Sequence, residues 1–394
     1  MVSARSSILS LDNMKKPKCN VVIWFVLETQ VSVVEFQEFF QENVLNLRLP
    51  SQDLTYPEFR QYFHQTMGYL FWKWDENFHV QNHIDICDEF KTQSGPVLES
   101  TVLKLNEKLL SQPWPDQRSP WKFLLINNYE RGQFPKTLVL LVLHHGMGDG
   151  YSFLKLIQNH LVGDIYKGKT AKPKMGIASP GKDIWGSLVL PFKIAYEFSE
   201  QALSYDFNEW HRSGWKLTGE VKVARTKRIP IAFVKQLKTK FGVSFSAILS
   251  AAAAGGIRKY FLDHGILLPE SMRVFLPLPF PNHPDDKLVT HLTGCYYKLP
   301  VGEPFPQKRV EAAHRNFESF RGSSIPLVNF YLALIGGALP SCMFALNKNY
   351  HCTGIFSNFP GDEETQIFMM NRKIEEFSYN VGYLHGATGL QIIF

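Results

Sequence analysis

The stretch 138–150, which reads LVLLVLHHGMGDG, constrains the fold more than any other part of the chain. It begins with an apolar run that is typical of a strand buried on both faces of a sheet. Three glycines then predict a tight loop, and apolar residues at helical spacing over 151–161 predict a helix after it. The chain therefore presents His144 and His145 at the carboxyl end of a rigid central strand, where α/β proteins usually place reactive groups.

These two histidines favour acid–base chemistry over metal binding. Adjacent residues of a strand point to opposite faces, so His144 and His145 cannot bind one metal ion together. One imidazole can face a cleft while the other packs inward and holds the backbone. Because a histidine titrates near neutral pH, it is the usual general base of enzymes. We predict one catalytic imidazole and no metal site; the alternative is a purely structural histidine pair.

Asp149 and its flanking glycines complete the loop. The Asp149 carboxylate can hydrogen-bond back to the loop or pair with an arginine, and the candidates are Arg118 and Arg273. Either contact would fix the turn. Gly148 and Gly150 have no side chains, so they leave room for a bulky substrate near the imidazole.

Composition narrows the class of protein. With 394 residues, of which 45% are hydrophobic, the chain can build two domains or one large domain with a sizeable core. A net charge of +6 suits an anionic ligand or an anionic membrane surface. Lysine and arginine are scattered rather than clustered, which argues against nucleic-acid binding.

Cysteines and the N-terminus indicate a cytosol-facing protein. Five cysteines, an odd number, are dispersed and lack the spacing of metal ligands, so we expect reduced thiols; they are Cys19, Cys87, Cys295, Cys342 and Cys352. The first twenty residues lack the apolar core of a secretory signal, and no signal peptide is expected.

Two apolar segments raise the question of membrane contact. Residues 327–346 contain no charge and have the length of a membrane span, but polar residues and Pro340 interrupt them. We favour a buried or membrane-grazing helix that ends near Pro340 over a true span. The segment 184–198 contains Pro191 and Lys193 and is better interpreted as an interfacial segment.

Alternating patterns predict an α/β architecture in the first half. The expected strands are 20–28, 78–84, 121–127 and the central run, and the expected helices are 33–45, 95–110 and 151–161. The polar segment 163–180, rich in Lys, Gly and Pro, is the best candidate for a crossing between domains. We therefore divide the chain into a first domain at 1–162, a crossover linker and helix at 163–220, and a second domain at 221–394.

The second half repeats the mixture of strands and helices. A long helix is expected over 184–208. The expected strands are 222–230, 273–278, 294–300 and 354–358, and the expected helices are 231–240, 244–263 and 303–320. No internal repeat or low-complexity tract is apparent.

The pattern His-His-x-x-x-Asp-Gly at 144–150 resembles the signature of acyltransferases with the two-domain chloramphenicol-acetyltransferase-like fold, which include peptide-synthetase condensation domains. Three further blocks resemble those of one branch, the wax ester synthase/diacylglycerol acyltransferase family. They are FHVQNHI at 78–84, RSPWKFLLI at 118–126 and SNFPG at 357–361. Loose blocks in the right order around a specific motif are stronger together than any one alone.

The resemblance implies two three-layer α/β domains with an active-site tunnel between them. Acyl-CoA would enter from one side, and a fatty alcohol or diacylglycerol from the other, to give a wax ester or triacylglycerol. Beyond acyl-CoA as co-substrate, no cofactor is implied. The expected location is peripheral, at the endoplasmic reticulum membrane or a lipid-droplet surface, and the oligomeric state is not predicted.

The resemblance also implies roles for single residues. The second motif histidine is the family's general base, which transfers to His145. His144 would support it, Asp149 would be structural, and Gly150 would make space near the reacting atoms. Trp121 and Asn358 match the flanking blocks as pocket or scaffold positions.

The chain departs from the family in its second half. The family's Asn-Asp pair at the start of a helix falls at Ser246 and Ala247, so a hydrogen-bonding group is kept in Ser246 but a carboxylate is lost. The sequence also stops at Phe394, where relatives continue through another strand and helix. Both departures bear on activity.

Three functions remain open. The first is O-acyl transfer to a long-chain alcohol or diacylglycerol, with His145 taking the hydroxyl proton. A second keeps the fold and uses another alcohol or an amine as acceptor. The third is an inactive lipid-binding or membrane-associated remnant, suggested by Ala247 and the early stop. A covalent serine mechanism is disfavoured because no Gly-x-Ser-x-Gly elbow is present.

Overall fold

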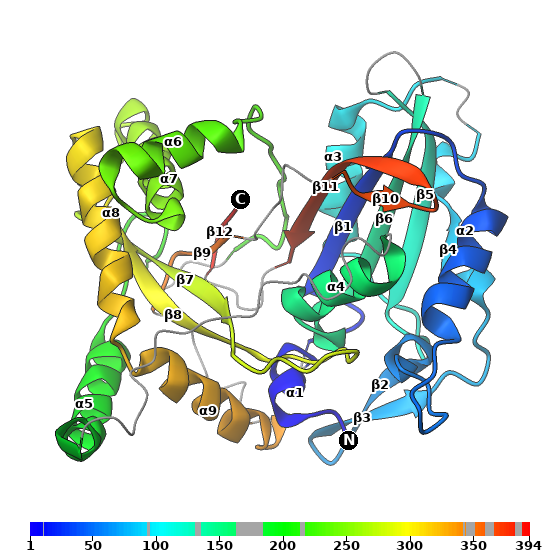
Figure 1. The fold of residues 1–394 in the computed structure, drawn as a ribbon, viewed down its shortest axis with the longest axis horizontal. Helices are drawn as coiled ribbons and strands as arrows, with labels where there is room; N and C mark the ends of the chain where they lie inside the picture. The colour runs from blue at the N-terminus through cyan, green and yellow to red at the C-terminus, as the bar shows by residue number, and fades with distance from the viewer. Residues whose placement is uncertain are drawn as a thin grey trace.

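The protein is described from a computed structural model. The structure describes residues 1–10, 12–92, 95–130, 135–162, 184–212, 217–341, 343, 351–358, 366–382 and 388–394, with only the backbone for 184–190 and 321. Two sheets, each with its own helices and core, lie side by side (Figure 1).

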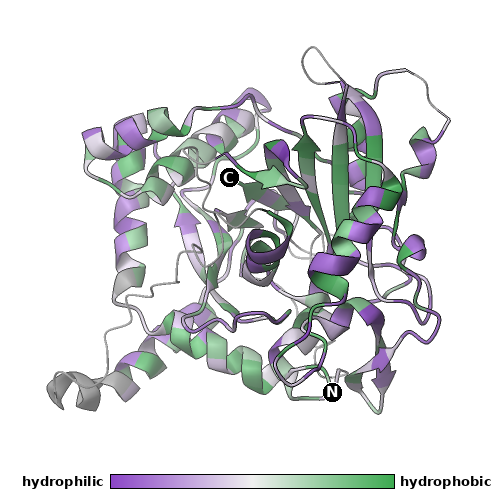
Figure 2. Cartoon of the chain, turned by 45° about the vertical axis from the view of Figure 1, so that its right-hand side comes forward, coloured by the Kyte–Doolittle hydropathy of each residue, from purple (hydrophilic) through white to green (hydrophobic). Residues whose placement is uncertain are grey.

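The first sheet has six strands in the order β10-β11-β1-β6-β5-β4. Their bounds are β1 (Asn20–Leu27), β4 (Ile84–Ile86), β5 (Trp121–Glu130), β6 (Pro135–His144), β10 (Phe368–Met369) and β11 (Arg372–Val381). Strand β6 lies between β1 and β5, is antiparallel to both, and is buried from Thr137 to His144. The predicted buried central strand at 138–143 is therefore confirmed, and Figure 2 shows how apolar this sheet is.

Helices cover both faces of the first sheet, which gives three layers. One face packs against α2 (Val33–Phe40) and α4 (Gly150–Leu156), and the other packs against α3 (Glu99–Leu109). Helix α2 begins at the Ser32 cap and buries Phe36 and Phe40 on the sheet. The three predicted helices of the first half are confirmed, although 41–45 and 157–161 continue α2 and α4 as π-helical turns.

The second sheet has four strands in the order β12-β9-β7-β8. Their bounds are β7 (Met272–Pro279), β8 (Leu292–Leu299), β9 (Gly354–Ser357) and β12 (Leu390–Ile393). Its core includes side chains of three helices, α6 (Ile231–Phe241), α7 (Phe245–Asp263) and α8 (Pro306–Arg321). The predicted strands at 273–278, 294–300 and 354–358 and the three predicted helices are confirmed within a few residues at their ends.

The second half of the chain contributes a strand to the first sheet, which no sequence pattern predicted. Strand β11 pairs with β1 from Val21 to Leu27, so residues 366–382 complete the first sheet. The assignment of all of 221–394 to the second domain is wrong for this segment. It failed because strand pairing between distant segments leaves no local pattern.

The predicted strand at 222–230 is also wrong. This segment has no strand pairing and instead runs past helix α3 of the first domain. There, Arg225 Nη1 donates to Glu99 Oε1 at 2.7 Å, and the Val223 N–H donates to Glu107 Oε1 at 3.0 Å. The basic residues of this segment pair with acidic side chains of α3 and, through Arg225 and Arg228, with Glu376 of β11, so their alternation does not mark one face of a strand. The predicted crossing at 163–180 lies entirely outside the described residues.

Some elements had no sequence counterpart. Strands β2 (Gln61–Thr66) and β3 (Tyr69–Trp74) form a separate hairpin, and only a short β4 forms near the strand predicted at 78–84. Near the N-terminus, α1 (Ala4–Ser10) contacts both the loop after β6 and helix α9 (Ile325–Gly337).

Within the described residues, no single helix is long and apolar enough to span a membrane. The bent pair α6 and α7 meets the length and composition test together, with 103° between the two helices. Of the predicted apolar segments, 327–337 lie in α9, which ends before Pro340, while 342 and 344–346 lie outside the described residues. The segment 184–198 lies in α5 (Ile184–Leu203), which contains Pro191. Four of the cysteines, Cys19, Cys87, Cys295 and Cys352, are buried, and Cys342 lies outside the described residues.

Candidate active site

The histidine motif forms the turn between β6 and α4. His144 is the last residue of the strand, and His145–Met147 form a single 3₁₀ turn. Asp149 then caps α4, because its carboxylate accepts a hydrogen bond from the Ser152 N–H at 2.8 Å. The pattern of a strand, a glycine-rich loop and a helix is the one predicted from the sequence.

His144 points inward and holds the backbone of the turn. Its side chain is fully buried, and Nδ1 accepts a hydrogen bond from the Gly146 N–H at 3.1 Å. Since Nδ1 is the acceptor, the proton of a neutral ring is on Nε2, which faces Asp12 Oδ2 at 3.4 Å. These contacts give His144 a structural place, in line with the supporting role expected for it.

The N-terminal segment packs against this turn, a contact for which the sequence carries no signal. The Asp12 carboxylate also accepts a hydrogen bond from the Cys19 N–H at 2.9 Å, and the Cys19 carbonyl accepts one from the His145 N–H at 2.7 Å. Burial alone would raise the pKa of Asp12, but the hydrogen bonds from His144 and the backbone hold it below its ordinary value. At Gly146, a Cβ would lie 2.8 Å from the Cα of Ser10, so only glycine fits.

His145 is the one motif side chain that is left available. The residue is half-buried, and neither ring nitrogen has a hydrogen-bond partner among the described residues; Nδ1 is buried. Burial lowers the pKa of His145, and the neighbouring Asp149 carboxylate offsets this only in part. A neutral imidazole with an unoccupied nitrogen can accept a proton, which is the chemistry required of a general base.

Asp149 has a histidine rather than an arginine as its partner. His283 Nε2 lies 3.0 Å from Asp149 Oδ1, and both side chains are buried, so the predicted pairing with Arg118 or Arg273 is wrong. The carboxylate also accepts from the His291 N–H at 2.7 Å. Burial alone would raise the pKa of Asp149, but these hydrogen bonds, with His283 first among them, lower it.

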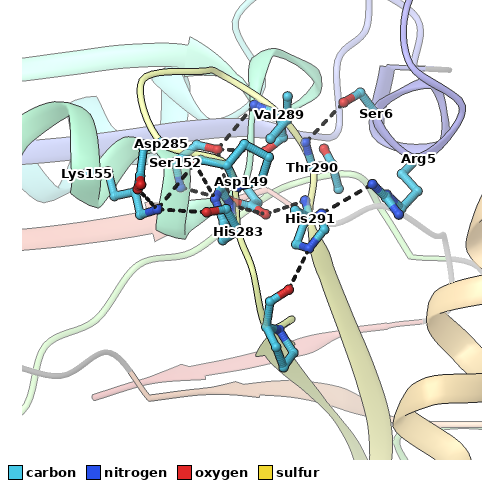
Figure 3. Close-up of polar contacts among 12 residues, drawn as sticks. Arg5, Ser6, Asp149, Ser152, Lys155, His283, Asp285, Val289, Thr290 and His291 are labelled. Carbon is cyan, nitrogen blue, oxygen red and sulfur yellow. Dashed lines mark hydrogen bonds and ion pairs between the residues drawn. The ribbon is translucent and has the colours of Figure 1, made fainter. Parts of the chain in front are cut away.

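Both new partners come from the second domain, on the loop between β7 and β8 (Figure 3). The loop is held to α4 at further points, because Ser152 Oγ donates to the Val289 carbonyl at 2.7 Å and Lys155 Nζ donates to the His283 carbonyl at 3.0 Å. The sequence offered only a weak signal here: PNHPDDK at 281–287 is a polar, proline-containing loop. Nothing in it names Asp149 as the partner of His283.

The motif glycines pack closely. A Cβ at Gly148 would lie 3.3 Å from the Ser152 Cβ and 3.4 Å from the ring of Phe153. Gly150 is the first residue of α4 and is half-buried. Its space-making role next to a substrate stays a prediction.

Trp121 lies in the core of the first domain. Its side chain is buried, its indole stacks on His83 with 4.4 Å between ring centroids, and its Nε1–H donates to the Phe59 carbonyl at 2.8 Å. Of the two alternatives, a pocket or a scaffold position, these contacts favour the scaffold.

Ser246 and Asn358, expected from separate blocks, lie together in the second domain. Asn358 follows β9, and its Nδ2 donates to Ser246 Oγ at 3.2 Å, next to the Ser244 cap of α7. Ala247 is buried at the same helix start. Contact of this pair with substrate, like the tunnel between the domains, stays a prediction, and 359–361 of the third block lie outside the described residues.

Among the described residues, no group of three or more His, Cys, Asp or Glu side chains could hold a metal ion.

Comparison with known proteins adds relatives to this geometry. No family model matches the chain. A protein named as a diacylglycerol O-acyltransferase of Mycobacterium tuberculosis is 21% identical over 374 residues, which cover 85% of this chain and 72% of the relative. The O-acyltransferase WSD of Acinetobacter baylyi is 22% identical over 357 residues, 83% of this chain and 75% of the relative.

Solved structures agree on the fold. The wax ester synthase/diacylglycerol acyltransferase from Marinobacter aquaeolei superposes with a TM-score of 0.62 at 15% identity, over 99% of this chain and 88% of that one. The chain is therefore similar in sequence to named O-acyltransferases and shares the α/β fold of the solved wax ester synthase/diacylglycerol acyltransferase.

Proposed function

We propose that the protein transfers a fatty acyl group from acyl-CoA to the hydroxyl group of a long-chain alcohol or diacylglycerol, to give a wax ester or triacylglycerol. The observation that carries the proposal is the contrast within the motif. The side chains of His144 and Asp149 are fully engaged in holding the turn, whereas His145 is partly exposed and has no partner on either nitrogen among the described residues. The names of the sequence relatives support the reaction class.

The proposed reaction needs one base and no covalent enzyme intermediate. Neutral His145 takes the hydroxyl proton as the oxygen attacks the thioester carbonyl carbon. The carbon–sulfur bond then breaks, and the imidazolium returns the proton to the CoA thiolate, so that charge and atoms balance. General base catalysis supplies about 10²–10⁴-fold. The remaining acceleration would come from holding the two substrates in the right geometry, which can supply roughly 7–11 kcal/mol.

A lipid surface is part of the same proposal. Both acceptors are poorly soluble in water, so the enzyme would meet them at the cytosolic face of the endoplasmic reticulum membrane or at a lipid droplet. Exposed apolar side chains on α5 and α9 support such an encounter, including Phe192, Tyr196, Tyr331 and Ile335. Co-sedimentation with liposomes or artificial lipid droplets tests this part separately from catalysis.

The test of the reaction is an assay of purified protein with palmitoyl-CoA and either hexadecanol or dioleoylglycerol. Labelled wax ester or triacylglycerol is separated by thin-layer chromatography. We expect product from the wild type and none above background from His145→Ala. Ester synthesis retained by His145→Ala would overturn the role of the base, and preference for an amine in a competition assay would favour a different acceptor.

One observation favours the non-catalytic alternative. Ala247 occupies the helix start where the resemblance to the family implies a carboxylate, and the neighbouring Ser246 Oγ accepts a hydrogen bond from Asn358 Nδ2. If the folded wild type binds long-chain acyl-CoA but forms no ester with any acceptor, lipid binding without catalysis is the better description.

A further inference from the structure

The pairing of Asp149 with His283 joins the two domains at the motif. His283 Nε2 lies 3.0 Å and 3.2 Å from the two carboxylate oxygens of Asp149. The exposed fractions of His283 and Asp149 are 6% and 1%. The imidazole comes from the loop between β7 and β8, whereas the carboxylate caps the first turn of α4 (Figure 3). The contact is thus a buried bridge between domains, four residues along the chain from His145.

Both nitrogens of the His283 ring face acceptors. Nδ1 lies 3.0 Å from the Pro284 carbonyl, and Nε2 faces the Asp149 carboxylate. Ser152 Oγ, at 3.5 Å from Nε2, gives its own proton to the Val289 carbonyl and so also faces His283 as an acceptor. A neutral imidazole has one N–H and would leave one of these contacts without a proton. The ring is satisfied on both sides only as an imidazolium.

The other charged and titratable groups around this pair come from three elements. Helix α4 contributes Lys155, which donates to the His283 and Pro284 carbonyls, and Tyr151, whose ring lies 4.8 Å from that of His283. The loop itself contributes His291, at 5.4 Å between ring centroids, and Asp285, which pairs with Lys155. From α1, Arg5 Nη2 lies 3.2 Å from His291 Nδ1. Among the residues that the structure describes, the Asp149 carboxylate is the one anion in direct contact with His283.

We propose that His283 is a positioning residue of the acyl transfer: as an imidazolium supplied by the second domain, it holds the Asp149 carboxylate and, through it, the turn that carries His145. The inference rests on the proposed function. Asp149 transmits the constraint in two ways, because its backbone N–H donates to the Val289 carbonyl at 3.1 Å and its side chain caps α4. His283 touches no reacting atom in this scheme, so its effect is on geometry.

The first experiment compares substitutions of two histidines, one on the loop between β7 and β8 and one that faces this loop from the first domain. His283→Gln removes the cation beside Asp149. The matched control is His160→Gln, because His160 Nε2 lies 3.4 Å from Asp286 of the same loop but does not contact Asp149. A displacement of about 1 Å at a reacting group costs about 10²-fold. We expect kcat of His283→Gln to fall by roughly 10- to 100-fold with KM for acyl-CoA little changed, and His160→Gln to stay near the wild type.

The second readout is the pH profile, which a merely structural role would not move. Wild-type kcat should decline on the alkaline side, and His283→Arg, which keeps a cation beside Asp149 at every pH, should lack that decline. The acidic limb, set by His145, should be the same in both proteins. Equal kcat losses in the two glutamine variants, or an alkaline limb that His283→Arg leaves unchanged, would overturn the proposal.

Unfolding measurements keep the test independent of catalysis and of how well the arginine fits. A double-mutant cycle of Asp149→Asn and His283→Gln in urea should show strong non-additivity, because each change removes the same contact. Additive effects would contradict the bridge. If the wild type makes no ester but the cycle is non-additive, the proposed function fails while the ion pair stands.

Discussion

Replacement of Asp149 by asparagine removes one charge from the motif and almost no volume. The carboxylate uses separate oxygens for separate donors, since Oδ1 accepts from the Ser152 N–H and Oδ2 from the His291 N–H. An asparagine has one oxygen, so one of these two donors must lose its acceptor. The buried imidazole of His283 loses its anionic partner at the same time.

The expected loss is large for these reasons. Removing one member of a buried ion pair costs about 3–5 kcal/mol, and leaving a buried N–H without an acceptor costs about 1–3 kcal/mol. The two costs share the same atoms and do not add fully, so we expect Asp149→Asn to lower the free energy of unfolding by about 3–5 kcal/mol. Native proteins have about 5–15 kcal/mol in total, which makes this a severe change.

The assay is urea unfolding at pH 7, followed by tryptophan fluorescence. The matched control is Asp285→Asn on the same loop, where the carboxylate pairs with Lys155 but is 81% exposed. An exposed pair of this kind contributes about 0–1 kcal/mol. A stability for Asp149→Asn within about 1 kcal/mol of the control would refute the reasoning that Asp149 is the central link of the turn.

Three further outcomes follow from the same structure. Burial lowers the pKa of His145 in the folded state, so below about pH 6.5 the unfolded chain binds more protons at this residue than the folded protein does. Acidification should therefore lower the free energy of unfolding through His145. Thermal unfolding measured between pH 5 and 8 checks the sign of this effect. Trp121→Phe leaves the Phe59 carbonyl without its donor and should cost about 1–3 kcal/mol in urea unfolding with KM for acyl-CoA unchanged. Leu140→Ala, in the fully buried centre of β6, should cost about 2–5 kcal/mol by the same measurement, and a loss below 1 kcal/mol would contradict its core position.

The local parts of the fold could be predicted because their signals are local. The buried strand, the glycine loop and the helix of 138–161 appear in the sequence as a change from a continuous apolar run to helical spacing. The different surroundings of His144 and His145 agree with the prediction that one imidazole packs inward, although His145 belongs to the 3₁₀ turn and not to the strand on which that prediction was based. The meeting of Ser246 and Asn358 agrees with two blocks that the sequence analysis had marked separately.

The parts that could not be predicted depend on contacts between distant segments. Strand β11 enters the first sheet although more than 340 residues separate its register partners Val21 and Val381. Similarly, the choice of His283 over an arginine as the partner of Asp149 depends on how the loop between β7 and β8 reaches the first domain. Neither feature has a period or a motif of its own in the sequence. Hydrophobic patterning shows which face of an element is buried, but it does not show which other segment covers that face.

The central claim is that His145 acts as the base because it is the motif side chain left free at the end of β6. The most direct measurement is the steady-state rate of ester formation by His145→Gln, compared with the wild type at pH 7.5 and with equal folding shown by circular dichroism. A loss of about 10²-fold or more in kcat, with KM for acyl-CoA retained, is the predicted result. A variant that folds and makes ester at the wild-type rate would contradict it.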